Sequence, residues 1–97
     1  MATYFVELPG SLKLSELAKA IEGEEALGTQ FVGSRLWMNA ANKLSNLAEF
    51  RELDAPPNPP LKTPKLTKTL APGDKPEWAG AMIVDGTDEH VVYLLRA

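Results

Sequence analysis

One segment limits what this chain can fold into more than any other: residues 55–76, which read APPNPPLKTPKLTKTLAPGDKP. This segment holds seven of the eight prolines of the chain. Proline cannot continue a helix or donate a hydrogen bond inside a sheet, and adjacent prolines favour extended backbone. We therefore predict a long Pro/Lys-rich loop over residues 55–76, between a helix-rich front half and a strand-rich tail.

The length and composition bound the class of protein. The chain has 97 residues, so we predict a single domain, 1–97, with one hydrophobic core. It contains no cysteine, which excludes disulfide frameworks, iron–sulfur clusters and thiolate metal sites. The first residues lack the basic region of a signal peptide, and no stretch approaches the roughly 18 apolar residues of a membrane span. These features predict a cytoplasmic protein that does not contact a membrane.

The first half begins with a strand and a helix. Residues 3–8 are aromatic and β-branched, which predicts a short strand. Residues 11–22 predict a helix, with Ser11 or Ser15 as the N-cap and Gly23 immediately after the last turn. One apolar stripe follows helical spacing along this segment, and it consists of Leu14, Leu17, Ala18 and Ile21.

Residues 24–53 contain an ambiguous stretch and the strongest helical pattern. The ambiguous part, 29–32, fits a short strand between two glycines, but the preceding residues also fit a further helical turn. Residues 35–53 predict a second helix that packs on the sheet. One face of this helix is widened by Leu36 and Phe50, and it consists of Trp37, Ala40, Ala41, Leu44, Leu47, Ala48 and Arg51.

The tail predicts a β-hairpin. Two apolar, β-branched runs, 78–84 and 90–96, flank the tight-turn signal Asp85-Gly86. Both faces of 90–96 are apolar, which predicts the middle strand of a sheet, with 3–8 beside it. The expected fold class is α+β: a small antiparallel sheet of three to four strands with two helices packed on one face, and the Pro-rich loop before the C-terminal hairpin.

Catalytic and cofactor motifs are not found in the sequence. Residues 28–34 have the two glycines of a phosphate-binding loop but lack the lysine that reaches the phosphates. His90 is the only histidine, and it lies near Asp85, Asp88 and Glu89 in a turn whose spacing matches no EF-hand. We therefore predict no catalytic residue, no cofactor and no metal, and we expect that the protein is not an enzyme.

The charges are segregated along the chain. Residues 1–54 carry eight acids and five bases, whereas 55–76 carry four lysines and one aspartate. This pattern predicts a basic loop on an acidic body. Four lysines and an acidic pI of about 5.1 do not favour nucleic-acid binding. Residues 57–62 also fit a P-x-x-P-x-K pattern, of the type that aromatic grooves bind.

The leading functional hypothesis is a small protein-binding module without enzymatic activity, because loops on a rigid body usually carry binding. Such a protein would occupy the surface of a host or cognate protein, as the accessory and inhibitor proteins of phages and mobile elements do. The predicted partner-binding residues are Lys62, Lys65, Lys68, Lys75 and Trp78; Trp37 is expected in the core. Two alternatives remain: an assembly subunit that forms a homo-oligomer through its Pro-rich arm, and a ligand- or metal-binding protein that uses the acidic turn near His90.

Overall fold

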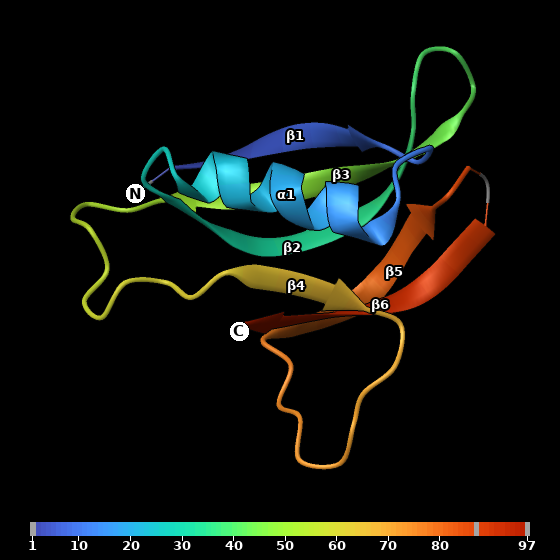
Figure 1. Cartoon of the computed structure of the whole chain (residues 1–97). Helices are drawn as coiled ribbons and strands as arrows, with labels where there is room; N and C mark the ends of the chain where they lie inside the picture. Colours follow the sequence, from blue (N-terminus) through green and yellow to red (C-terminus); the bar gives the residue numbers. More distant parts are fainter. Residues whose placement is uncertain (1, 87, 97) are drawn as a thin grey trace.

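The computed structural model describes residues 2–86 and 88–96, and this part of the chain forms two three-stranded antiparallel sheets and one helix. Sheet A has the strand order β1-β3-β2, and sheet B has the order β4-β6-β5 (Figure 1). In chain order the elements are β1 (Thr3–Pro9), α1 (Leu14–Glu25), β2 (Thr29–Met38), β3 (Leu44–Glu52), β4 (Pro64–Thr67), β5 (Trp78–Val84) and β6 (Asp88–Arg96).

The predicted α+β fold is wrong. The structure is mostly β, and it has one helix and two sheets rather than two helices on one face of a single sheet. Sheet A and α1 come from the first half of the chain, and sheet B comes from the second half. Within the described residues, no helix is long and apolar enough to cross a membrane.

The predicted helix over 35–53 is a β-hairpin made of β2 and β3. Its turn is fixed by Asn39, whose side-chain oxygen accepts hydrogen bonds from the N–H groups of Ala41 (2.9 Å) and Lys43 (3.1 Å). Asn42 follows with a φ of 59°, a left-handed conformation that asparagine tolerates better than most residues. Because β2 begins at Thr29, the ambiguous segment 29–32 is a strand.

The strand predicted over 3–8 and the helix that follows it are both confirmed, with shifted ends for the helix. The helix begins at Leu14, after Lys13, whose backbone N–H donates to a carboxylate oxygen of Glu16 at 2.9 Å. Neither predicted serine is therefore the N-cap. The helix also passes through Gly23 and ends at Glu25, so the predicted stop at this glycine is wrong.

The predicted C-terminal hairpin is confirmed as β5 and β6, and β6 is the middle strand of its sheet. Thr87, which belongs to the turn predicted from the sequence, lies outside the described residues. The first strand does not lie beside β6, because β1 pairs with β3 instead. The Pro/Lys-rich segment is not a loop throughout, since four of its residues form β4 and pair with β6.

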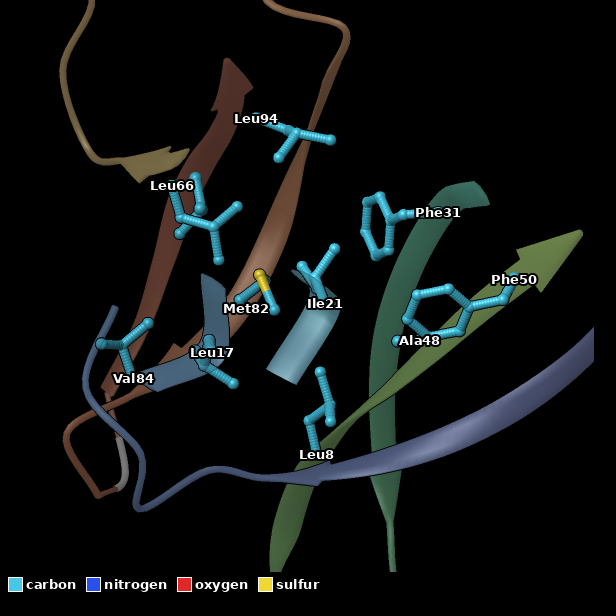
Figure 2. Packing of buried hydrophobic residues seen from close by; sticks show 11 residues of the cluster. Leu8, Leu17, Ile21, Phe31, Ala48, Phe50, Leu66, Met82, Val84 and Leu94 are labelled. Carbon is cyan, nitrogen blue, oxygen red and sulfur yellow. The ribbon is translucent and has the colours of Figure 1, made fainter. Parts of the chain in front are cut away.

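The core lies where α1 packs against β2 of sheet A and β4 of sheet B. Leu17 and Ile21 of the helix are fully buried at its centre (Figure 2). The side chains around them come from both sheets, and they include Leu8, Phe31, Ala48, Phe50, Leu66, Met82, Val84 and Leu94. Burial of one such large aliphatic or aromatic side chain contributes roughly 1.5–3 kcal/mol, so this cluster is the main source of stability.

On the side where β2 and β5 run together, two contacts join the sheets. The ring of Trp78 at the start of β5 packs edge-on against Phe31 of β2, with ring centroids 5.3 Å apart. The fully buried side chain of Asn46 in β3 bonds both backbone groups of Ile83 in β5: its Nδ2 donates to the carbonyl oxygen at 2.9 Å, and its Oδ1 accepts from the N–H at 2.8 Å. The amide thereby pairs with β5 as a neighbouring strand would.

At another edge of the molecule, Arg96 connects several segments. Its guanidinium donates to both carboxylate oxygens of Glu25 at the end of α1, at 2.6 and 2.7 Å. It also donates to Glu77 before β5 at 2.9 Å and to the carbonyl oxygen of Lys62 at 3.2 Å. Glu25 in turn accepts from the N–H of Phe31 in β2. These contacts hold the helix, both sheets and the Pro-rich segment together.

Candidate protein-binding face

The outer face of sheet A is shaped by a β-bulge in β2, located between Phe31 and Gly33. Phe31 points into the core, and Val32 is the extra residue. Because side chains alternate along a strand and a bulge adds one residue, the alternation restarts after it. Arg35 and Trp37 therefore lie on the outer face, away from the core.

The register of the strands brings a group of side chains together on this outer face. Phe5 of β1 lies opposite Glu49 of β3, and Leu47 of β3 lies between Glu7 of β1 and Arg35 of β2. We name this surface the aromatic face, and its residues are Phe5, Arg35, Trp37, Leu47 and Glu49.

Large side chains are exposed on the aromatic face and at the adjacent end of the β2–β3 hairpin. Phe5 is 47% exposed and Trp37 is 43% exposed; Met38 and Leu44, next to the turn, are 54% and 41% exposed. The guanidinium carbon of Arg35 lies 5.1 Å from the centre of the Phe5 ring, which is a cation–π contact. This stacking places the arginine across the face, where its donor groups stay available.

A shallow hollow of about 190 Å³ opens on the same surface. It lies beside Gly33, and the indole of Trp78 occupies the space that a side chain there would fill: an added Cβ would lie 3.2 Å from the indole nitrogen. The indole N–H donates no hydrogen bond to another described residue. The full lining comprises Phe5, Gly33, Ser34, Arg35, Leu47, Glu49 and Trp78.

A larger cavity, of about 720 Å³, lies at the hairpin end of sheet A. Met38, Leu44 and Pro9 supply its apolar walls. Its polar side is ordered by Glu7, one of whose carboxylate oxygens accepts hydrogen bonds from the Ser45 hydroxyl at 2.8 Å and from the Asn39 side-chain amide at 3.2 Å.

The residues predicted to bind a partner are not brought together. Lys65 lies on β4 opposite Leu95, whereas Lys68 and Lys75 belong to the loop between β4 and β5, which projects beyond sheet B on the side away from α1 (Figure 1). Lys62 lies in the preceding loop, where its carbonyl oxygen accepts from Arg96.

The two tryptophans differ from the prediction. Trp78 is half-buried and packs against the core at the junction of the sheets, and its neighbours are residues of β2 rather than the four lysines. Trp37, which was expected in the core, is exposed on the aromatic face. Arg35 and Trp37 were missed as surface residues because a helical pattern was assigned to what is a strand, and Phe5 was missed because the sequence does not show which strand pairs beside β1.

The acidic turn near His90 is the site that the sequence suggests, as an alternative, for a ligand or a metal. His90 lies on β6 opposite Met82. Among residues 2–86 and 88–96, no three His, Asp or Glu side chains gather in a way that could hold a metal ion.

Two titratable side chains near α1 have shifted pKa values, and both have structural causes. Burial raises the pKa of the Tyr4 hydroxyl, which donates to Glu24 of the helix at 2.9 Å. The hydrogen bonds to Glu25 raise the pKa of Arg96. Because both groups hold the helix to the sheets, neither points to catalysis.

Comparison of the chain with models of protein families, with curated proteins and with solved structures gives no match. The surfaces of the chain itself are therefore the guide to its function.

Proposed function

We propose that this chain is a small non-enzymatic protein-binding module, and that it uses the aromatic face to occupy the surface of another protein. The observation that carries the proposal is the exposure of Phe5 and Trp37 beside Arg35 on one sheet. Tryptophan and arginine dominate the binding energy of protein interfaces, and aromatic residues are enriched there.

The strands that carry the aromatic face favour binding without a change of their conformation. β3 is the middle strand of sheet A, and its inward side chains Ala48 and Phe50 are fully buried in the core. The exposed residues of β1 and β2 therefore stand on strands that pair with this buried middle strand. A rigid surface loses little conformational entropy when a partner binds, which favours affinity.

The chemistry of the hollow defines the partner. Its apolar walls, Phe5 and Leu47, can accept one apolar side chain. Arg35 offers donors at its rim, and the indole N–H of Trp78 offers one more. The partner is therefore a protein surface that presents an apolar side chain next to a carboxylate or carbonyl group, and the bound module would block that surface.

The test is a capture experiment with the tagged full chain in a bacterial lysate, analysed by quantitative mass spectrometry before and after nuclease treatment. We expect one protein in stoichiometric amount that survives nuclease. Trp37→Ala should reduce its recovery at least about tenfold, because truncation of a central interface tryptophan commonly costs about 2 kcal/mol or more.

Two charge-reversing substitutions show whether the partner binds to the aromatic face or to the lysines that the sequence predicted. Arg35→Glu should abolish capture, whereas Lys68→Glu, an equal change of charge on the β4–β5 loop, should leave it intact. Loss with Lys68→Glu and retention with Arg35→Glu would move the binding surface to the lysines. If no protein is enriched over a tag-only control, the chain is not a binding module for that proteome and the proposal fails there.

A further inference from the structure

The outer strand edges of the two sheets differ in whether another element covers them. In sheet B, α1 packs along β4, and the outer side of β5 meets β2 and the Asn46 amide. That contact also covers the outer edge of β2 in sheet A. Within the described residues, β1 alone has a paired neighbour on one side, β3, and no element packed along the other.

The direction of the backbone groups of β1 follows from one hydrogen bond. The N–H of Glu52 donates to the carbonyl oxygen of Ala2 at 2.9 Å, so these two residues form a hydrogen-bonded pair. Hydrogen-bonded and non-hydrogen-bonded pairs alternate along antiparallel strands. Thr3, Phe5 and Glu7 therefore direct their N–H and C=O groups away from β3, and all three residues are exposed.

An open strand edge is a template for another strand, and proteins usually block it with lysine, proline or a covering element. β1 contains no lysine, and its proline stands at its end, where Pro9 closes the strand. At its centre the open edge instead carries the exposed ring of Phe5. The edge is thus seven residues long and unprotected in its middle.

We propose that β1 pairs antiparallel with β1 of a second copy of this chain, about a two-fold axis at Phe5. This register opposes Phe5 to Phe5 of the second copy and opposes Thr3 to Glu7 on both sides of the axis. All three pairs use the outward N–H and C=O groups. The result is one continuous six-stranded sheet, with an aromatic face from each copy on the same side.

The side chains of β1 are complementary to themselves in this register. On the inner face Tyr4 meets Val6 of the second copy, an aromatic and β-branched pair of the kind that stabilises sheets, and both side chains are only half-buried in the single chain. Moving the two-fold axis toward the C-terminal end would bring Pro9, which has no N–H, into the ladder, and an axis at position 7 would also oppose the two Glu7 carboxylates. The opposite shift shortens the pairing.

The inference does not depend on the proposed function, and the test needs only purified full-length chain. Sedimentation equilibrium should show a monomer–dimer equilibrium between micromolar and near-millimolar protein. Phe5→Lys should remove the dimer, because it opposes two lysines at the axis. The control Leu27→Lys, which makes a similar change at an exposed loop residue, should dimerise like the unaltered chain.

Two further samples test the backbone pairing and the axis. Thr3→Pro removes an outward N–H while keeping the bonds to β3, so it should weaken the dimer roughly tenfold. A mixture of Phe5→Lys with Phe5→Glu should form a heterodimer, because position 5 meets position 5. Monomer at every concentration, dimer in Phe5→Lys, or no heterodimer in the mixture would overturn the proposal. Trp37→Ala should still dimerise, which keeps this result separate from the partner-binding test.

Discussion

At the scale of single residues, Asn46 occupies a position where a polar side chain is buried and needs all its hydrogen bonds. It is a polar side chain with no solvent exposure, and both its amide groups are used by the backbone of Ile83. A buried amide of this kind is stabilising only while every partner is present, since a buried group without a hydrogen bond costs roughly 1–3 kcal/mol. One of the two contacts that join β5 to sheet A therefore depends on a single side chain.

Asn46→Ala should lower the free energy of unfolding by about 3 kcal/mol, because it leaves the N–H and the C=O of Ile83 buried without partners. Urea denaturation measures this change. Gln30→Ala is the matched control: its amide bonds Arg51 near the surface, so its loss should cost less than about 0.5 kcal/mol. Equal effects of the two substitutions would mean that Asn46 does not join the sheets.

At the scale of secondary-structure elements, Gly23 tests where α1 ends. The helix passes through this glycine, and a Cβ added there would meet no atom within 4 Å. Gly23→Ala should raise the unfolding free energy by about 0.5–1 kcal/mol, because alanine loses less backbone entropy in a helix. Thermal unfolding followed by circular dichroism measures it. Destabilisation instead would indicate a helix that stops at Gly23, as the sequence predicted.

The elements predicted correctly are those with one dominant signal. The strand at 3–8, the helix around Leu17 and Ile21, and the C-terminal hairpin with its Asp-Gly turn follow from local pattern alone. The hairpin of β2 and β3 was missed because Trp37, Leu44, Leu47 and Ala48 follow helical spacing, although in the structure the adjacent Leu47 and Ala48 lie on opposite faces of β3. The turn at 39–43 decides between them, and its signal is a pair of asparagines rather than Asn-Gly.

The candidate site could be predicted only in part, because it depends on which strands pair with one another. Trp78 was singled out from sequence, and it does line the hollow on the aromatic face. Its neighbours Phe5 and Arg35 come from strands that pair through β3, and no local pattern reveals that pairing. The bulge at Val32, which sets the side on which Trp37 lies, has no sequence marker other than Gly33.

At the scale of the whole molecule, Arg96 is the residue that joins the most segments. Its side chain and that of Glu25 are 12% and 7% exposed. Arg96→Met should lower the unfolding free energy by about 3–5 kcal/mol, because it leaves a buried carboxylate unpaired. Adding Glu25→Gln should recover most of this loss, since the new amide still accepts from the N–H of Phe31 and carries no charge.

Arg51→Met serves as the control for the arginine substitution, because Arg51 is exposed and bonds Gln30 near the surface. We expect it to change the unfolding free energy by less than about 0.5 kcal/mol. Chemical denaturation of the unaltered chain, Arg96→Met, Glu25→Gln and the double variant gives a double-mutant cycle. A loss for Arg96→Met no larger than that for Arg51→Met would show that the contact does not hold the segments together.

The bulge in β2 also affects how this chain can change in length. The aromatic face depends on the number of residues between Gly33 and Trp37 as much as on their identity. Deletion of Val32 alone would remove the extra residue and restore regular pairing, so that Trp37 would stay on the outer face, whereas one residue inserted between Gly33 and Trp37 would turn Trp37 toward the core and Leu36 toward solvent. One-residue insertions should therefore be far better tolerated in the loops on either side of β4 than between Gly33 and Trp37.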